Sequence, residues 1–256
     1  MISVSGLGIK LGNFVLKDIN FDADNSECLT IIGPNGCGKT TILECIAGLH
    51  RPREGKIIID EVDVTTLPPE KRRIGYVPQD YVLFPHLTAD QNVAFGLWNR
   101  RGKHTDEANK VMHLLDIEHL VGRDVRTLSA GERQKVALAR ALAVNPKALL
   151  LDEPFSALDP LAREKLRREL KIVLSKILHT LELPVIYVTH DLSEALMMSD
   201  QIAVMSNGRI EQVGSRDEVV ENPSSQFVAE FLGFNVIHGY VISAKKDNDT
   251  LLVDIN

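Results

Sequence analysis

The chain has 256 residues, of which 44% are hydrophobic and 25% are charged, and its formal net charge is −6. This composition excludes extended disorder and is typical of one large domain or of two lobes that share a core. The acidic balance argues against a nucleic-acid binder with a basic face, and three cysteines close together in sequence are typical of a reducing compartment.

The N-terminal segment shows no targeting signal. Residues Met1 to Gly8 contain no basic start and no long apolar stretch, so we expect no signal peptide. No window in the chain approaches about 18 uninterrupted apolar residues, so we expect no membrane span. Any role in a membrane process would then be performed from the cytoplasmic face.

A phosphate-binding loop follows the apolar run Cys28 to Ile32, which predicts a buried strand. The segment Gly33-Pro-Asn-Gly-Cys-Gly-Lys-Thr-Thr41 fits the pattern G-x-x-x-x-G-K-[ST]. Its glycines let backbone N–H groups and the next helix N-terminus point at phosphates, while a lysine adds charge and a threonine hydroxyl binds Mg²⁺. The predicted nucleotide-binding residues are Gly33, Pro34, Asn35, Gly36, Cys37, Gly38, Lys39, Thr40 and Thr41.

Cys37 lies inside this loop, at the start of the following helix. A helix N-terminus lowers a thiol pKa, so one hypothesis is that oxidation of Cys37 inhibits the protein. The alternative is that a small residue simply fills a variable position of the loop.

Short apolar runs alternate with longer helical patterns, which predicts a parallel sheet covered by helices. Ligands of such sheets collect where the strands end, so Gly33, Gln79, Asp152 and His190 are expected to converge on one rim. The predicted strands are Thr30 to Ile32, Ile57 to Ile59, Ile74 to Val77, Ala148 to Leu151, Val185 to Val188 and Ile202 to Met205.

A helical lobe is predicted at about residues 86–145, inserted into the sheet domain. Its expected helices run from Ala89 to Arg100, from Thr105 to Leu115 and onward from Ser129. Ser129 and Glu132 form a capping box, and the same Ser-Ala-Gly start presents free N–H groups to an anion. A later pattern, Leu161 to Leu183, predicts a surface helix on the sheet.

Two acids end the apolar strand Ala148 to Leu151. A buried strand that ends in a carboxylate holds Mg²⁺ in phosphate-loop enzymes, so Asp152 is the expected metal partner. Glu153 is then placed to accept a proton from an attacking water. The alternative is that both acids merely start a turn before Pro154. His190 follows Thr189 at a strand end, and we expect a catalytic histidine there.

The C-terminal segment changes character after Gly233. Two apolar runs, Val236 to Ser243 and Leu251 to Ile255, flank a polar turn and predict a hairpin. We therefore expect a main domain at 1–235 and a β extension at 236–256, the start of a small β-domain that the chain does not complete.

Six motifs in order make residues 1–235 resemble the ATP-binding cassette family, the motor subunits of membrane transporters. They are the phosphate loop, Gln79 in Val77-Pro-Gln-Asp80, Leu128 to Gln134, Leu149 to Pro154, Ser156 to Asp159, and Thr189-His-Asp191. The resemblance implies an α/β fold: a P-loop NTPase of the RecA-like type, whose parallel-sheet core carries an antiparallel β subdomain and an inserted α-helical subdomain.

The resemblance also implies a head-to-tail homodimer that binds ATP and Mg²⁺ between its subunits. Ser129 and Gly131 of one subunit would contact the γ-phosphate held by Lys39 of the other, and Asp159 would cross the interface. Gln79 would touch Mg²⁺ and the attacking water, beside the metal ligands Thr40 and Asp152. The implied catalytic residues are Glu153, His190, Gln79 and Lys39.

Two positions depart from the family pattern. Ala130 replaces a common glycine, a change of one methyl group that the helix start tolerates. The aromatic residue that stacks on adenine is matched by Leu11, with Phe14 three residues further on, so Leu11 is the expected contact of the base.

The segments Tyr81 to Thr88 and Glu221 to Gly233 are similar to the importer branch of the family. Molybdate or tungstate is the expected cargo, with a sulfate, sugar or polyamine importer as the alternative.

A soluble cassette ATPase acting on DNA or ribosomes is a rival hypothesis that the acidic balance disfavours, and a non-hydrolysing regulator conflicts with the intact Glu153. The expected partners are an integral membrane permease and, indirectly, a solute-binding protein, with the chain peripheral on the cytoplasmic face and no nucleic acid bound. The candidate permease contacts are Phe84, Pro85, His86 and Leu87.

Overall fold

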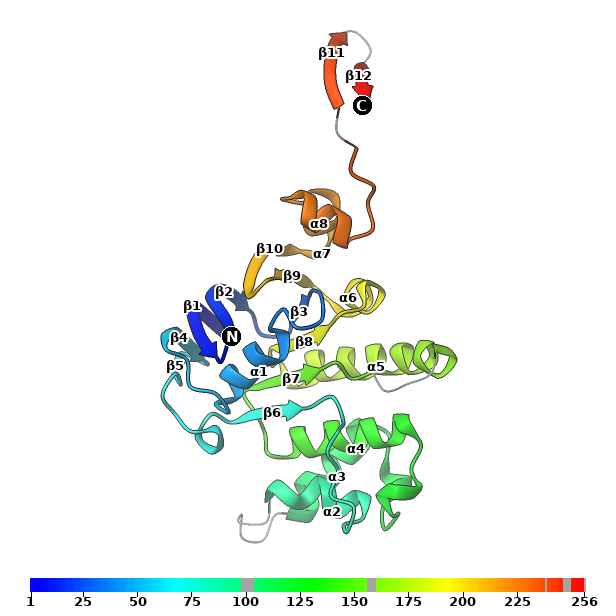
Figure 1. Ribbon diagram of the computed structural model, residues 1–256. Helices are drawn as coiled ribbons and strands as arrows, with labels where there is room; N and C mark the ends of the chain where they lie inside the picture. The colour runs from blue at the N-terminus through cyan, green and yellow to red at the C-terminus, as the bar shows by residue number, and fades with distance from the viewer. Residues whose placement is uncertain (98–103, 156–159, 238, 246–249, 256) are drawn as a thin grey trace.

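Two β-sheets and a lobe of helices form the body of the protein, as the computed structural model shows (Figure 1). The structure describes residues 1–97, 104–155, 160–237, 239–245 and 250–255. The larger sheet has six strands, parallel except for the edge strand β10. In spatial order they are β10 (Arg209–Ser215), β9 (Gln201–Ser206), β3 (Cys28–Ile32), β8 (Val185–Thr189), β7 (Ala148–Asp152) and β6 (Ile74–Val77).

The central strands are buried on both faces, which explains why they read as continuous apolar runs. Their side chains alternate between two cores. Leu149 and Leu151 pack into the core shared with the helical lobe, whereas Ala148 and Leu150 pack into the core shared with the second sheet. Because β6, β7, β8 and β3 are parallel neighbours, their carboxyl ends share one rim, as predicted.

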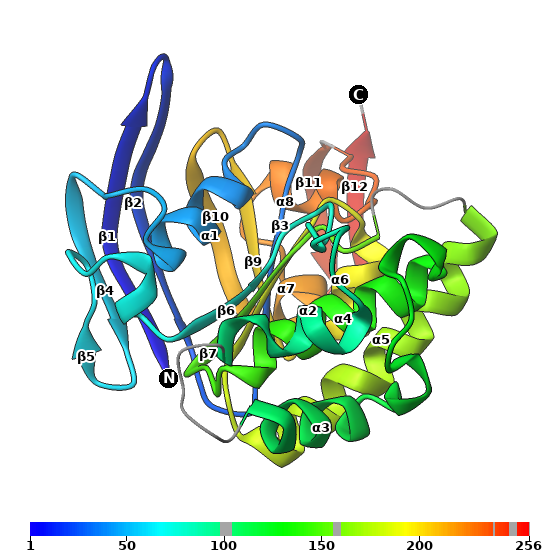
Figure 2. The ribbon, with the colours of Figure 1, turned by 90° about the horizontal axis from the view of Figure 1, so that it is seen from below.

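The second sheet is antiparallel and has four strands in the order β2 (Phe14–Ala23), β1 (Ile2–Leu11), β4 (Glu54–Ile59) and β5 (Val62–Asp63). Helix α1 (Lys39–Ala47) contributes to the core between the two sheets (Figure 2). The expectation that the run Ile57 to Ile59 joins the parallel sheet is wrong. This run lies in β4, where Ile57 and Ile59 are opposite Val4 and Ile2.

The helical lobe contains α2 (Ala89–Ala94), α3 (His104–Leu114) and α4 (Ala130–Ala143). Helix α2 is shorter than predicted because a 3₁₀ turn, Phe95–Leu97, follows it, and the rest of the predicted span lies outside the described residues. Ser129 caps α4 and forms the predicted capping box with Glu132. Three further 3₁₀ turns are Pro69–Lys71, Glu118–Leu120 and Val125–Thr127.

The remaining helices follow the lobe in sequence. They are α5 (Pro160–Leu181), α6 (Leu192–Met198), α7 (Arg216–Glu221) and α8 (Gln226–Phe231). The C-terminal strands β11 (Gly239–Lys245) and β12 (Thr250–Ile255) pair as an antiparallel hairpin, which confirms the two predicted strands. In Figure 1 this hairpin stands apart from the body, beyond α8.

Candidate functional site

The phosphate-binding loop connects β3 to α1 and requires glycine at two places. A Cβ atom at Gly33 would lie 2.2 Å from the Met205 carbonyl oxygen, and one at Gly38 would lie 2.5 Å from Cζ of Phe14. Gly38 also adopts φ 110° as the N-cap of α1, a conformation that L side chains rarely adopt. The loop therefore lies tightly against β9 and β2, with its backbone N–H groups at the helix start.

Lys39 points back into this loop. Its Nζ atom donates hydrogen bonds to the carbonyl oxygens of Gly33, at 3.0 Å, and Pro34, at 3.1 Å. It also lies 3.7 Å from Oε1 of Glu153. The buried Lys39 ammonium group is thus held by backbone carbonyl oxygens of the loop, at the first turn of α1. Its positive charge and the helix dipole both favour phosphate oxygens at this position.

Asp152, the last residue of β7, faces the start of α1. The Thr40 hydroxyl donates to Oδ1 at 3.1 Å, and the Tyr76 hydroxyl donates to Oδ2 at 3.3 Å. Burial is the main cause that raises the pKa of the Asp152 carboxyl above its ordinary value. This pair of hard oxygen donors, Thr40 and Asp152, fits Mg²⁺, which usually takes one or two protein carboxylates and completes its shell with phosphates and water.

Glu153 is held in an unusual backbone conformation between two partners. Its φ is 41°, and its N–H donates to the Val188 carbonyl at 2.9 Å. Oε2 lies 3.0 Å from Nδ1 of His190, while Oε1 faces Lys39. The strained φ turns the side chain out of the line of β7 and over the loop. The structure therefore brings together Lys39, Asp152, Glu153 and His190, as the sequence predicted.

A cavity of about 220 Å³ lies over the loop. Lys39, Thr40, Thr41 and Glu153 line it together with the loop residues Asn35, Gly36 and Gly38, and Phe14 forms one side. A second hollow of about 410 Å³ adjoins it and is also lined by Phe14, with Pro34 and Cys37.

Leu11 and Gln79 are among the predicted site residues that do not line either hollow. Leu11 is half-buried at the end of β1, whereas Phe14, at the start of β2, lines both hollows. The two-residue turn between β1 and β2 brings the Phe14 ring to the loop. The spacing in the sequence matched Leu11 to the aromatic position and did not reveal that Phe14 lies beside the loop. Gln79 is exposed two residues past β6. Asp159 lies outside the described residues.

Of the two interpretations of Cys37, the low thiol pKa is wrong and the small residue that fills space in the loop fits the structure. Burial raises the pKa of the Cys37 thiol, and the nearby Lys39 charge and backbone hydrogen bonds only partly oppose this. The side chain is enclosed rather than presented to solvent, at 5% exposure. Cys37 therefore fills space in the loop and lacks the exposed thiolate of a reactive cysteine.

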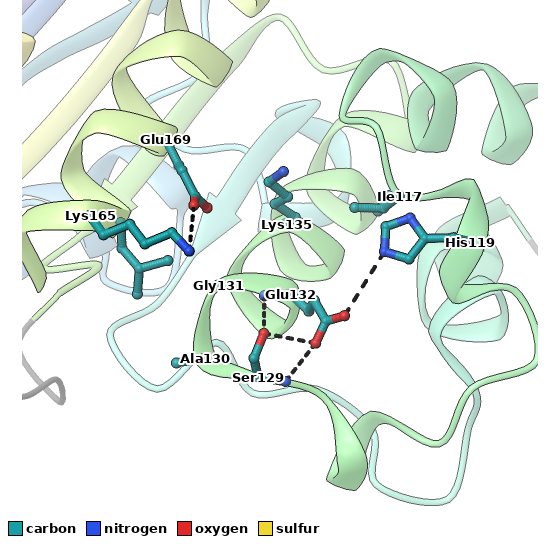
Figure 3. Close-up of a pocket in the computed structure, with 10 residues that line it drawn as sticks. Ile117, His119, Ser129, Ala130, Gly131, Glu132, Lys135, Lys165 and Glu169 are labelled. Carbon is teal, nitrogen blue, oxygen red and sulfur yellow. Dashed lines mark hydrogen bonds and ion pairs between the residues drawn. The ribbon is translucent and has the colours of Figure 1, made fainter. Parts of the chain in front are cut away.

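The second predicted anion site lies at the start of α4, in a separate pocket of about 330 Å³ (Figure 3). Ser129, Ala130 and Gly131 form one wall, and Lys165, Leu166 and Glu169 of α5 form the other. A Cβ atom at Gly131 would lie 2.4 Å from Cδ2 of Leu166, so glycine also permits the close packing of the two helices. Neither cavity over the phosphate loop includes Ser129 or Gly131 among its lining residues.

Among the candidate permease contacts, Phe84 belongs to a small cluster beside α4. The rings of Phe84 and Phe95 have centroids 4.2 Å apart, and Cζ of Arg140 lies 5.2 Å from the centroid of Phe84. Pro85 and His86 are exposed next to it, while Leu87 is half-buried.

Comparisons with known proteins show the family to which the chain belongs. The sequence model of the family described as ABC transporter matches residues 16–156, which is more than half of the chain. The chain belongs to the ABC transporter family. Within this family it is an ATP-binding subunit and an ATPase.

Several ABC proteins resemble the chain over most of its length. A molybdate/tungstate import ATP-binding protein of Pyrococcus abyssi is 46% identical over 243 residues, covering 93% of this chain and 70% of the relative. A sulfate/thiosulfate import ATP-binding protein of a Synechocystis species is 46% identical over 236 residues, covering 91% and 65%. The dimeric post-hydrolysis structure of the cassette MJ0796, bound to ADP and Pi, is 31% identical with a TM-score of 0.68, covering 84% of this chain and 99% of that one.

The described helices include none that is long and apolar enough to cross a membrane.

Proposed function

We propose that this chain is the ATP-hydrolysing subunit of an ABC importer for an oxyanion, molybdate or tungstate. The name of the Pyrococcus relative supports this cargo, and the equally identical sulfate/thiosulfate relative supports an oxyanion more broadly. A sugar or polyamine importer is the alternative, because the cassette holds ATP and the cargo passes through other subunits.

The Glu153 carboxylate carries the proposal. It is held at the edge of the phosphate cavity, with Oε2 3.0 Å from His190 Nδ1 and Oε1 3.7 Å from Lys39 Nζ. A carboxylate fixed there is positioned to accept a proton from a water that attacks the γ-phosphate. His190 orients it, and Lys39 moves from carbonyl oxygens to phosphate oxygens when ATP binds.

Mg²⁺, held by Thr40 and Asp152 with Gln79 as a further contact, would neutralise phosphate charge in this site. The chain's own residues supply the rest. The loop 33–41 fixes the triphosphate through backbone N–H groups, and Phe14 replaces Leu11 as the proposed contact of the adenine ring. No protein nucleophile is required, because phosphoryl transfer depends mainly on positioning and charge.

The separation of the two anion sites supports a head-to-tail homodimer. Ser129 and Gly131 line a pocket of the helical lobe, away from the cavity over the loop, so a second copy would be needed to bring them to one ATP. Asp159 is proposed to cross this interface. ATP binding would join the two copies and hydrolysis would let them separate, so that ATP hydrolysis drives a conformational change.

The proposed partners are a permease that contacts Phe84, Pro85, His86 and Leu87, and indirectly a solute-binding protein. The chain would then be peripheral on the cytoplasmic face of a membrane. Residues 1–235 form the proposed cassette, and residues 236–256 form a proposed C-terminal β extension.

The variant Glu153→Gln tests the assignment directly. ATP turnover should fall at least about a hundredfold, since general-base catalysis contributes about 10²–10⁴-fold, while ATP still binds. Calorimetric ATP binding and phosphate release measure the two effects. A variant that hydrolyses ATP at the parent rate would show that Glu153 is not the general base.

Uptake of molybdate, sulfate and spermidine by vesicles containing the co-purified permease would identify the cargo class.

A further inference from the structure

The hydroxyl proton of Ser129 is already engaged within the protomer. Oγ donates to Oε2 of Glu132 at 2.7 Å, and the Ser129 backbone N–H donates to the same oxygen at 2.7 Å (Figure 3). A serine hydroxyl has one proton, so Ser129 cannot donate to a phosphate while it donates to Glu132. These two residues are named the Ser129–Glu132 pair below.

Glu132 brings a full negative charge to the start of α4. The hydrogen bonds from Ser129 are the main cause that lowers the pKa of the Glu132 carboxyl. Its other oxygen, Oε1, faces two groups of the helical lobe: Nη1 of Arg123 at 3.4 Å and Nε2 of His119 at 3.9 Å. The carboxylate therefore occupies the position at a helix N-terminus that favours an anionic ligand.

We propose that the Ser129–Glu132 pair restrains the nucleotide-free protomer, so that Glu132 opposes ATP-driven joining of two copies. This inference rests on the proposed function, in which Ser129 faces the ATP of the partner subunit. For Ser129 to donate to that phosphate, Glu132 must release the hydroxyl and turn toward Arg123 and His119. Joining the copies also removes water from the pocket, which strengthens the repulsion between carboxylate and γ-phosphate.

The variant Glu132→Gln isolates this effect. Glutamine serves as well as glutamate at the third position of a capping box, so the helix start is retained while the charge is removed. In the Glu153→Gln background, the ATP concentration for half-maximal dimer should fall about threefold or more, because each dimer contains two such helix starts. ATP binding at high dilution, where only protomers are present, should be unchanged.

Two further variants separate the hydroxyl from a general effect of charge. With Ser129→Ala in place, Glu132→Gln should lose more than half of its effect, because the hydroxyl is no longer there to be released. Glu118→Gln removes another carboxylate of the same lobe, one that contacts His113 rather than Ser129, and should leave dimerisation unchanged.

Light scattering during ATP titration measures the dimer, and thermal unfolding shows that each variant is folded. A parent Glu153→Gln protein that stays monomeric with ATP removes the proposed function and the inference with it. A parent that dimerises while Glu132→Gln requires as much ATP, or more, overturns the inference alone. An equal gain from Glu132→Gln with and without the Ser129→Ala change would also overturn it, since the effect would then not pass through the hydroxyl.

Discussion

At the scale of single residues, Asp152 shows that the site is built at a cost to stability. Its pKa is raised by burial, so the ionised carboxylate is less favourable in the folded than in the unfolded protein. The stability that the protonated carboxyl contributes is fully present below its pKa in the unfolded protein. It is lost as the pH rises through its higher pKa in the folded protein. As the pH rises through this raised pKa, ionisation of Asp152 makes the folded state less stable.

We predict that Asp152→Asn unfolds at a higher temperature than the parent at pH 7, in the absence of nucleotide. The difference should vanish in acid, where the aspartate is neutral in both states. Magnesium-dependent hydrolysis should fall at least about a hundredfold, since several kcal/mol of charge stabilisation would be lost. Calorimetric melting and phosphate release measure both effects. A lower melting temperature at pH 7 together with unchanged hydrolysis would contradict this prediction.

Most of the site residues could be predicted because their chemistry is local in sequence. The phosphate loop reads directly from Gly33 to Thr41, and the acid pair reads from a strand that ends in Asp152 and Glu153. Phe14 could not be separated from Leu11, since only the path of the turn between β1 and β2 decides which side chain reaches the loop. The state of Cys37 could not be predicted either, because its pKa depends on burial against tertiary neighbours.

At the scale of elements, a buried ion pair joins α5 to α6. Arg167 donates to Oε1 of Glu194 from Nε at 3.1 Å and from Nη2 at 2.9 Å. The hydroxyls of Tyr187 and Thr189 donate to the other oxygen, at 3.0 and 2.6 Å. Every oxygen of Glu194 is thus satisfied in a place where an unpaired carboxylate would be costly.

We predict that Arg167→Met destabilises the protein by about 3–5 kcal/mol, because it leaves the buried Glu194 charge unpaired. The double variant Arg167→Met with Glu194→Gln should recover part of this loss, since the uncompensated charge is removed as well. Urea unfolding measures both. A loss below about 1 kcal/mol for the single variant would show that the pair behaves like a surface salt bridge.

The elements that sequence predicted best are those with one uniform pattern, either a helical period or a continuous apolar run. The long α5 and the two-sided strands β7 and β8 follow directly from their patterns. The first strand was not predicted, because its apolar alternation is interrupted. The strand register shifts between Val4 and Leu7, where Gly6 has φ 59°. The alternation of side chains between the two faces of the sheet therefore has opposite phase before and after this point. The sheet to which Ile57 to Ile59 belongs depends on that strand, so it could not be assigned either.

At the scale of the whole molecule, the C-terminal hairpin is separate from the sheets that form the site. Strands β11 and β12 pair only with each other among the described residues, and an isolated two-stranded hairpin is at best marginally stable in water. The hairpin is therefore expected to add little to the stability of the cassette.

We predict that a chain ending at residue 235 retains its ATPase rate within about twofold and its melting temperature within a few degrees, since surface changes away from core features usually cost about 0.5 kcal/mol or less. Phosphate release and calorimetry measure these quantities. A truncated chain that fails to fold would show that residues 236–256 belong to the cassette itself.

Head-to-tail assembly is the central claim: the family resemblance implies it, and it fits two anion sites that line separate pockets of one protomer. It can be tested by mixing two proteins that each carry one introduced cysteine in the Glu153→Gln background, one with Asn35→Cys on the phosphate loop and one with Lys165→Cys beside Ser129. The native cysteines Cys28, Cys37 and Cys45 are buried and give little background. With a short bismaleimide, the account predicts a cross-linked heterodimer that forms with ATP and disappears without it. A stable dimer with ATP that yields no link between positions 35 and 165 would contradict the account.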